Sequence, residues 1–383
     1  MLAGTNVALG VTGSVAAVKV VELAHELRRQ GASVRAVMTD SARSIVHPYA
    51  VEFATDAPVV TEITGAVEHV ELCGREGWAD VLLVAPATAN TVGKMAAAID
   101  DTPVTTTATT ALGADVPVVV APAMHEPMYD HPGVLDAIDR VESWGVEFVA
   151  PRIEEGKAKI ATEEAIVLAT ARAAGENPLA GMTVVVTSGA TAEPVDPVRV
   201  LTNRATGKTG RAVAKAAYVR GADVVLVHDG PVVPYADVRR VTTGVEMLEA
   251  VLAAAPEADA LVSAAAISDY TVEASAEKIR SGQDLTLDLE STPKLIDTVR
   301  ERFPELPIVG FKAETGDDES TVAAAREILE RVDLAFVVAN DASVMGAEQT
   351  RAFFVTADDE REFAGSKRDL GLAVADELAA LLA

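Results

Sequence analysis

The chain carries the same strand, turn, helix and strand pattern twice, and this repetition limits the folds that it can adopt. Residues 6–14 read as a buried strand that enters a glycine turn, a helical stretch follows, and 32–38 read as a second strand. Residues 182–189 open in the same way, and their helix leads into a strand within 219–227. Each copy is typical of the start of a parallel α/β sheet. The repeat predicts an α/β protein with two doubly wound, Rossmann-like domains.

Other short β-branched runs alternate with helical patterns in both halves, as a doubly wound sheet requires. In the first half we expect strands at 6–11, 32–38, 80–84, 116–120 and 146–149. In the second half we expect them at 183–187, 223–227, 259–264, 307–311 and 334–338, with an antiparallel addition at 352–356. Residues 174–181 have the glycine, proline and asparagine content of a linker. We therefore expect domains at 1–176 and 177–383.

Composition narrows the setting in which the chain works. Its 383 residues, 49% of them hydrophobic, suffice for two or three domains with their own cores. No apolar stretch approaches the roughly 20 residues that cross a bilayer, and the first residues lack a basic flank and a cleavage-site pattern. We therefore expect a cytoplasmic protein. A single cysteine, Cys73, excludes a disulfide framework within the chain and an all-cysteine metal site.

The net charge of −26 bears on partners and on the solvent. Nucleic acid and anionic membranes would both be repelled by such a field, so we expect neither as a partner. The acidic excess extends over both halves of the chain and is not confined to a tail. Concentrated salt would screen the resulting self-repulsion, which favours a halophilic origin over a merely acidic protein.

Two polar segments follow buried strands of the first half, where open α/β sheets bind ligands. Residues 86–91 offer hydroxyl and amide groups, and 122–129 offer a histidine and two methionines. The glycine turn at 10–14, with the Ser14 hydroxyl and the helix start after it, suits one phosphate. Ordinary turn and cap residues are the alternative interpretation of each segment taken alone.

Together these segments resemble the signature of the cysteine-decarboxylase flavoproteins, which bind FMN. The resemblance implies a flavodoxin-like first domain. It places FMN contacts at Gly13, Ser14, Thr39, Thr88, Ala89, Asn90, Thr91 and Met124. It places substrate contacts at His125, Met128, Lys157 and Lys159.

His69 lies in a run that resembles the decarboxylase motif of this family, and the resemblance implies that it is the catalytic base. Two positions depart from the bacterial pattern. His125 stands where the family has asparagine, and Arg152 stands where a loop cysteine reprotonates the product. Residues 154–159 are similar to the archaeal branch, so activity is still expected with another proton donor.

The second half contains Gly207-Lys-Thr209, which suggests a Walker A loop. That loop requires glycine where Thr202 stands and should follow its strand directly, so we reject it. Residues 196–210, 263–270 and 309–315 instead resemble phosphopantothenate–cysteine ligases.

This second resemblance implies that CTP and Mg²⁺ activate 4′-phosphopantothenate as an acyl-cytidylate, which the amine of cysteine then attacks. Lys278 would supply the catalytic cation and Asn203 the donor to the acyl oxygen. Nucleotide contacts would be Ser263, Ala264, Ala265, Asp269, Lys278, Phe311 and Lys367.

Both resemblances together imply a bifunctional enzyme of coenzyme A biosynthesis, in which the ligase product is the decarboxylase substrate. Its partners would be 4′-phosphopantothenate, cysteine and CTP. It would be a homo-oligomer with a trimeric decarboxylase core and dimerising ligase domains, an arrangement compatible with a dodecamer. The alternative is an FMN-binding scaffold or regulatory protein that has lost decarboxylase activity. The absent loop cysteine suggests it, and the presence of His69 and Lys278 argues against it.

Overall fold

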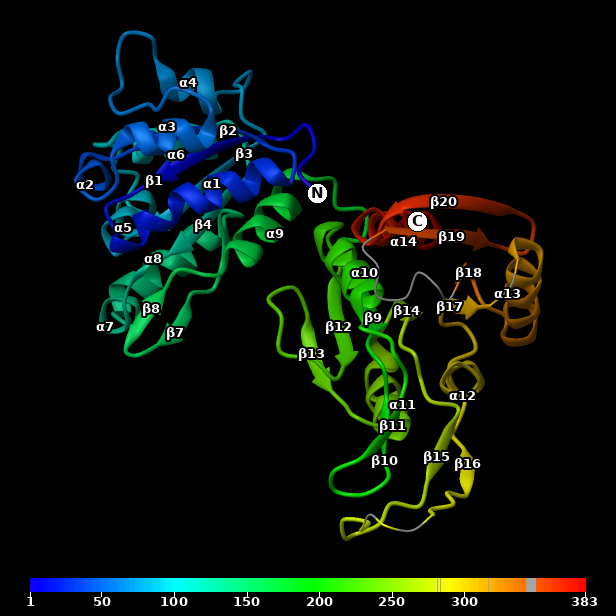
Figure 1. Ribbon diagram of the computed structural model, residues 1–383. Coiled ribbons are helices and arrows are strands. Elements are labelled where there is room, and N and C mark those ends of the chain that lie inside the picture. The colour runs from blue at the N-terminus through cyan, green and yellow to red at the C-terminus, as the bar shows by residue number, and fades with distance from the viewer. Residues whose placement is uncertain (281, 283, 316, 342–348) are drawn as a thin grey trace. The chain divides into compact units, whose positions relative to one another are not determined.

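The computed structural model describes residues 1–383 except 281, 283, 316 and 342–348, and it divides into two compact units (Figure 1). The units are Met1–Gly175 and Glu176–Ala383. The division falls inside the stretch 174–181. Leu179 is fully buried and its backbone N–H donates to the Arg220 carbonyl (2.9 Å), so the later part of this stretch packs on the second unit.

The first unit is built on a five-stranded parallel sheet in the order β2-β1-β3-β4-β6. This is the flavodoxin-like strand order, and it confirms the fold class expected from the sequence. Its strands are β1 (Asn6–Val11), β2 (Ser33–Met38), β3 (Val81–Ala87), β4 (Val118–Pro122) and β6 (Glu147–Phe148). β3 is buried along its whole length, as its unbroken apolar sequence requires of a strand covered on both faces.

Helices of the first unit bury one face against this sheet. α1 places Val20, Leu23, Ala24 and Leu27 on its buried side, at the i, i+3, i+4, i+7 spacing of an amphipathic helix. The helical segments are η1 (Val15–Lys19), α1 (Val20–Arg29), α2 (Asp40–Arg43), α3 (Pro48–Thr55), α4 (Glu68–Cys73), α5 (Ala89–Ala96), α6 (Pro103–Gly113), α7 (Glu126–Tyr129), α8 (Pro132–Glu142) and α9 (Glu163–Ala174).

A small antiparallel sheet, which the sequence patterns did not predict, is added to this unit. Its order is β5-β8-β7, with β5 (Met124–His125), β7 (Arg152–Glu154) and β8 (Lys157–Lys159). The tight turn between β7 and β8 uses Glu155 and Gly156, both with positive φ. It brings the segment after β6 back beside the segment after β4.

The second unit contains an eight-stranded sheet in the order β13-β12-β9-β14-β17-β18-β19-β20. Six neighbouring strands are parallel, whereas β19 and β20 run antiparallel at one edge. The parallel strands are β13 (Asp237–Arg240), β12 (Asp223–His228), β9 (Thr183–Thr187), β14 (Ala260–Ser263), β17 (Ile308–Glu314) and β18 (Phe336–Asp341). The antiparallel pair is β19 (Gln349–Val355) and β20 (Glu360–Ser366), and β19 is the addition expected from the sequence.

Helices and two hairpins complete the second unit. The helical segments are α10 (Lys208–Val219), α11 (Gly244–Ala254), η2 (Ala255–Glu257), α12 (Leu295–Arg302), α13 (Asp318–Val332) and α14 (Lys367–Leu382). The hairpins are β10 (Ala192–Pro194) with β11 (Val200–Thr202), and β15 (Tyr270–Val272) with β16 (Leu289–Ser291). None of the described helices has both the length and the apolar character that crossing a bilayer requires.

Candidate functional site

A cavity of about 560 Å³ lies where β1, β3 and β4 end in the first unit. Most of its wall is apolar, and its cationic side chains come from η1 and from the β5-β8-β7 sheet. The lining residues are Gly13, Ser14, Val15, Ala16, Val18, Lys19, Thr88, Ala89, Ala123, Met124, His125, Met128, Arg152, Lys157, Ala158, Lys159 and Ile160. This mixture of apolar wall and few polar groups is typical of a small-molecule site.

Hydrogen bonds from two hydroxyl groups connect the three loops that meet at this cavity. Thr12 is buried, its hydroxyl donates to the Pro86 carbonyl (2.7 Å), and it accepts from the backbone N–H of Thr88 (3.2 Å). Ser14 donates to the Ala123 carbonyl (3.0 Å). The turns after β1, β3 and β4 are therefore held in one arrangement. The sequence motif indicates Ser14 but not Thr12, whose only sequence signal is a hydroxyl at the end of a buried strand.

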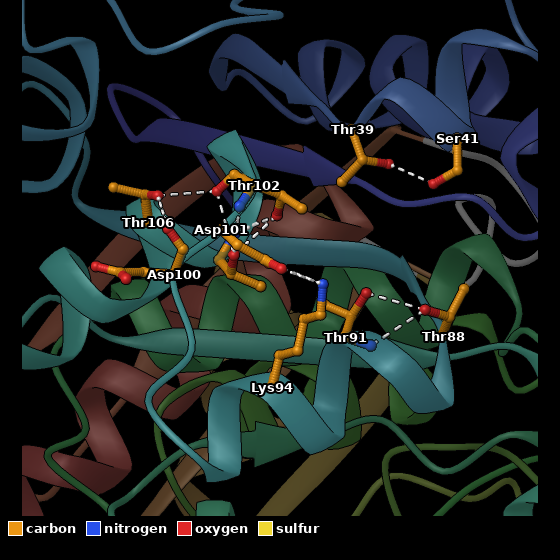
Figure 2. Close-up of polar contacts among 10 residues, drawn as sticks. Thr39, Ser41, Thr88, Thr91, Lys94, Asp100, Asp101, Thr102 and Thr106 are labelled. Atoms are coloured by element: carbon orange, nitrogen blue, oxygen red, sulfur yellow. Dashed lines mark hydrogen bonds and ion pairs between the residues drawn. The ribbon is translucent and has the colours of Figure 1, made fainter.

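Gly13 and Thr39 meet through Ser41. A Cβ atom on Gly13 would lie 2.5 Å from the Cβ of Ser41, so only glycine fits this close approach. The Thr39 hydroxyl lies 3.1 Å from that of Ser41 and accepts from the Ala42 N–H (3.2 Å), which caps α2 (Figure 2). Thr39 thus lies beside the Gly13 turn and does not line the cavity.

The hydroxyl-rich start of α5 is also partly engaged within the protein. Thr88 caps the helix by accepting from the Thr91 N–H (3.2 Å), and the two hydroxyls lie 2.9 Å apart (Figure 2). Thr88 and Ala89 reach the cavity, whereas Asn90 is exposed and Thr91 is buried beneath the cap. Thr91 therefore supports the loop, and the lining contains neither Asn90 nor Thr91.

An ion pair fixes the turn between α5 and α6. Lys94 Nζ lies 2.7 and 2.8 Å from the two carboxylate oxygens of Asp101, and Thr106 donates to the Asp100 carbonyl (2.9 Å) (Figure 2). These contacts hold the helix that begins at the cavity.

Two lysines of the β5-β8-β7 sheet differ in how closely acidic side chains compensate their charge. Lys159 Nζ lies 3.1 Å from carboxylate oxygens of both Glu154 and Glu155, and its hydrogen bonds to these side chains raise its pKa. Lys157 faces His125 across the β5-β8 pair, and no ion pair links it to an acidic side chain in the described part of the chain. Lys157 therefore brings the less compensated charge to the cavity.

Arg152 lies in the cavity wall, at the position that the sequence resemblance gave to the absent thiol. Its guanidinium donates to Glu154 (3.0 Å) and to the Ile160 carbonyl (3.3 Å). Cys73 is fully buried in the core at the end of α4, and burial raises the pKa of its thiol to about 12. The chain's one thiol is thus protonated and outside the cavity lining.

His69 does not line the cavity of its own copy. It lies on α4, at the end of the unit opposite β7 and β8 (Figure 1). The ring is partly buried, and its buried Nδ1 has no hydrogen-bond partner among the described residues. The residue expected to be the base is therefore separated from the cavity wall within one chain.

A second cavity, of about 120 Å³, lies where β9, β14 and β17 end in the second unit. The start of α10 and the start of α14 form much of its wall. The lining residues are Gly189, Ala205, Thr206, Gly207, Lys208, Thr209, Gly210, Ala264, Ala265, Ala266, Phe311, Ala313, Asn340, Thr350, Lys367 and Leu370. Four of the expected nucleotide contacts are among them, namely Ala264, Ala265, Phe311 and Lys367.

Two glycines allow the start of α10 to approach the end of β9. Gly207 has φ +69°, and a Cβ there would lie 2.9 Å from the backbone N of Gly189. A Cβ on Gly210 would lie 2.6 Å from that of Ser188. The positive end of the α10 dipole therefore faces the cavity and favours anions. Lys208, the first residue of this helix, is not among the predicted nucleotide contacts, because Gly207-Lys-Thr209 does not fit a Walker A loop.

A buried hydroxyl shapes the turn after β14. Thr187 accepts from the N–H groups of Ala264 and Ala265, each at 3.1 Å. Asn203 donates from Nδ2 to the Ala266 carbonyl (2.9 Å), so this amide lies beside the cavity without lining it. Thr187 is a further residue that the sequence motifs did not single out.

Three expected contacts lie outside the lining of this cavity. Ser263 is half-buried at the end of β14, and the Asp269 carboxylate is paired with exposed Lys294 (2.5 Å). Lys278 is exposed and lies in the chain between β15 and β16.

Comparison with known proteins gives matches over nearly the whole chain. The family model for flavoproteins matches residues 1–175, and that for the DNA/pantothenate metabolism flavoprotein C-terminal domain matches 179–382. The coenzyme A biosynthesis bifunctional protein CoaBC of Thermococcus kodakarensis is 48% identical, covering 100% of this chain and 96% of its own. The protein of the same name from Bacillus subtilis is 37% identical, covering 91% and 88%. A crystal structure of the FMN-dependent cysteine decarboxylase SpaF is 34% identical with a TM-score of 0.41, covering 46% of this chain and all of that one.

Proposed function

Since the chain belongs to the family of coenzyme A biosynthesis bifunctional proteins, we propose that its two activities are divided between its two units. The protein is an enzyme of coenzyme A biosynthesis with phosphopantothenoylcysteine decarboxylase and ligase activities. The proposed division gives the carbon–carbon lyase to residues 1–176 and the carbon–nitrogen ligase to 177–383. Its support is that the flavoprotein model and the C-terminal domain model match separate, compact units. A scaffold without activity is not favoured.

The first unit uses FMN, and its cavity suits a flavin. The apolar wall can receive a ring system, and Gly13 and Ser14 bring the turn after β1 into the lining. We propose that Gly13, Ser14, Thr88, Ala89 and Met124 contact the cofactor, with Thr39, Asn90 and Thr91 supporting the same loops. When bound, FMN supplies the redox chemistry that makes the cysteinyl group an electron sink for loss of CO2.

The protein's own groups would position the anionic substrate. Lys157 and His125 lie side by side on paired strands at the cavity, where they can donate to a carboxylate or a phosphate. Lys159, held by two carboxylates, offers a weaker net charge, and Met128 adds polarisable wall. His69 would hold or accept the proton at the reacting thiol, because an imidazole nitrogen can act as a general base.

In the ligase, we propose CTP as the activating nucleotide and Mg²⁺ as its counterion. Lys208, Lys367 and the α10 N-terminus would face the phosphates, with Phe311 beside the nucleotide. No group of three acidic or histidine side chains suited to a metal occurs among the described residues. We therefore propose that Mg²⁺ is held chiefly by phosphate oxygens and water. Asn203, already fixed beside Ala266, would donate to the acyl oxygen.

Both sites point to assembly. His69 does not line the decarboxylase cavity, and Lys278 does not line the ligase cavity, of the same unit. A second copy that delivers each residue would complete the sites, which supports the trimeric decarboxylase core and the ligase dimer. We propose such a homo-oligomer, acting in the cytoplasm on 4′-phosphopantothenate, cysteine and CTP.

The product assay tests the proposed function directly. Purified protein with 4′-phosphopantothenate, cysteine, CTP and Mg²⁺ should form 4′-phosphopantothenoylcysteine and then 4′-phosphopantetheine, as weighed by mass spectrometry. Two control reactions replace CTP with ATP or remove Mg²⁺ with a chelator. Equal rates with ATP would contradict the CTP assignment, and ligation in the presence of excess chelator would contradict the metal assignment.

We also propose a salt-adapted, haloarchaeal type of protein, because a charge of −26 must be screened to be tolerated. The Debye length falls from about 10 Å at 0.1 M to about 3 Å at 1 M salt. We expect the melting temperature to fall on transfer from 2 M to 0.1 M KCl. A loss of about 3 kcal/mol would lower it by roughly 6–12 °C for units of this size. Sucrose at low ionic strength is the control, and an unchanged or higher melting temperature in dilute buffer contradicts the proposal.

A further inference from the structure

One edge of the first sheet is covered only in part by the described chain. β2 forms this edge, and among the described residues β1 is the one strand that pairs with it. Beside the later part of β2, Val60 crosses the edge. The Met38 N–H donates to the Val60 carbonyl (2.8 Å), and the Val60 N–H donates to the Ala36 carbonyl (2.9 Å). No described segment covers the start of β2 in this way.

Val34 presents its backbone at this uncovered part of the edge. Successive residues of a strand direct their N–H and carbonyl groups to alternate sides, and the Ser33 N–H donates inward to the Thr5 carbonyl (2.9 Å). The N–H and carbonyl of Val34 therefore face outward, like those of Ala36 and Met38. Within the described chain, no backbone group pairs with the two groups of Val34. One donor and one acceptor are thus available to a further strand.

A groove of about 740 Å³ follows the same part of the edge, and its lining includes Arg28, Val34 and Arg35. Side chains of a strand alternate between its faces, so Arg35 shares a face with Val37. Val37 packs in a core cluster with residues of α4, α5, α6 and α8, and this cluster contains no residue of α1. Arg28 lies near the end of α1 and so reaches the groove from the opposite face. One arginine therefore lies on each side of the open strand edge.

Both arginines pair with carboxylates that are themselves exposed. Arg28 lies 3.3 Å from a carboxylate oxygen of Asp56 and donates to the Ala54 carbonyl (3.1 Å). Arg35 lies 3.0 Å from a carboxylate oxygen of Glu71. The Asp56 side chain is 83% exposed and that of Glu71 is 62% exposed, and ion pairs between such exposed groups contribute little to stability. A ligand carboxylate can therefore take the place of either partner.

The Arg35 guanidinium is also held in orientation by an aromatic ring. Its central carbon lies 4.5 Å from the centre of the Trp78 ring, which is a cation–π contact. The Trp78 backbone N–H donates to the Glu71 carbonyl (2.8 Å), so the ring is fixed beside the end of α4. A guanidinium that lies against a ring keeps the donors along its edge available for a carboxylate.

We propose that the open edge of β2 is a docking site for an extended, acidic segment of a partner protein. The segment adds a strand beside Val34 and pairs with its N–H and carbonyl groups. Neighbouring residues of this strand point to opposite faces of the sheet, so two consecutive acidic residues meet Arg28 on one face and Arg35 on the other. The backbone bonds supply affinity, and the two arginines select for acidic side chains.

The composition of β2 argues against a second copy of this strand as the occupant. Residues 33–38 contain an arginine and no acidic side chain, so a copy of β2 would bring no carboxylate to the groove. The location also bears on the consequence of docking. The groove lies at the start of β2, whereas the decarboxylase cavity lies where β1, β3 and β4 end, and these strands are parallel. Docking would therefore attach a partner while the decarboxylase cavity stays open.

A short synthetic peptide tests the site on the full-length, flavin-loaded protein. The probe is the fluorescent peptide Thr-Val-Asp-Glu-Val-Thr, blocked at both ends, and its binding is followed by anisotropy at the lowest KCl concentration at which the protein keeps its flavin. The peptide with Asn and Gln in place of Asp and Glu should bind at least about 10-fold more weakly, because it lacks the charged hydrogen bonds.

N-methylation of the peptide tests the backbone pairing without any change to the protein. Only one of two consecutive N–H groups of a strand can face β2. Methylation at either Asp or Glu, but not at both of these positions in turn, should therefore weaken binding by about 10-fold or more. Methylation at the other position should change it by less than about twofold.

Variants of the protein test the two arginines and their partners with opposite signs. Arg28→Gln and Arg35→Gln should each weaken peptide binding by about 10-fold, while FMN and both enzyme activities are retained. Asp56→Asn and Glu71→Gln should each strengthen binding, because each frees a guanidinium for the peptide. Arg140→Gln is the matched control, because this guanidinium also lies over a tryptophan ring (5.6 Å) but outside the groove.

Each possible result decides for or against the docking site. Equal binding of the neutral peptide, tolerance of methylation at both positions, or no binding at about 1 mM peptide would overturn it. Citrate that binds as tightly as the peptide and displaces it would identify a site for small anions instead. Weaker binding in Asp56→Asn and Glu71→Gln would show that the groove has merely loosened, and would also overturn the proposal. Sensitivity to methylation at one position, losses in both arginine variants and gains in both carboxylate variants support it.

Discussion

Lys278→Ala is expected to lower the ligase kcat by about 10²- to 10³-fold, which is the usual cost of removing one group that stabilises transition-state charge. The deficit should appear in the first half-reaction, as slow release of pyrophosphate from labelled CTP in the presence of 4′-phosphopantothenate. Decarboxylation of supplied 4′-phosphopantothenoylcysteine should be unaffected, because the two activities are assigned to separate units. Rapid-quench analysis measures the first step.

Asn203→Ala provides the matched comparison for this result. Its amide lies beside the ligase cavity, so its loss should affect attack by cysteine more than formation of the acyl-nucleotide. We expect pyrophosphate release to continue in part and the acyl-cytidylate to accumulate. Wild-type pyrophosphate release in Lys278→Ala, or equal defects of the two variants in both steps, would reverse the assigned roles.

A mixture of these two variants tests whether the ligase site is shared between copies. If Lys278 of one copy serves the cavity beside Asn203 of another, a dimer with one variant of each kind contains one intact site. A random one-to-one mixture should then recover about a quarter of wild-type activity per chain. Two different affinity tags allow the mixed dimer, with one variant of each kind, to be purified. Its activity can then be compared with the activity expected from one intact site. No recovery would place both residues at a site within one chain.

His69→Asn is expected to lower decarboxylation by about 10²- to 10⁴-fold, the range for loss of a general acid–base group. Ligation should continue and 4′-phosphopantothenoylcysteine should accumulate. The protein should remain yellow, because the proposed flavin contacts, which run from Gly13 to Met124, do not include His69. Colourless protein would show instead that this histidine is needed to hold the flavin.

The complementary variant for His69 is Gly13→Val. Its added side chain must displace Ser41, so it should abolish flavin binding in the copy that carries it. Mixed trimers of the two variants would contain sites with an intact cavity and an intact histidine from a neighbour, again about a quarter of the total if pairing is random. A mixture as inactive as its components would contradict a decarboxylase site built from two copies.

Sequence patterns predicted the sheets better than the additions to them. Buried strands such as β3 and β9 were predicted because a short, unbroken run of β-branched residues is typical of a buried strand. β13, with the sequence Asp-Val-Arg-Arg, was missed because an exposed edge strand lacks such a run. The β5-β8-β7 sheet was missed for a related reason, since its strands are two or three residues long.

The candidate sites show a different limit of sequence reasoning. Thr39 and Thr91 have the residue types of ligand contacts, yet in the structure they take part in the caps of α2 and α5. Capping and ligand binding use the same hydroxyl groups at the same helix ends, so spacing alone does not separate them. Thr12 and Lys208 were overlooked because their importance comes from loops distant in sequence that fold beside them.

Each of the two large sheets draws its strands from one uninterrupted stretch of sequence, and neither exchanges a strand with the other. During synthesis, the last strand of the first sheet is translated before any strand of the second. At about 5–20 residues per second, the remaining 208 residues take roughly 10–40 s to translate. Folding of a mixed α/β domain is ordinarily complete in far less time. The nascent first half can therefore fold, and begin to bind FMN, while the second half is still being translated.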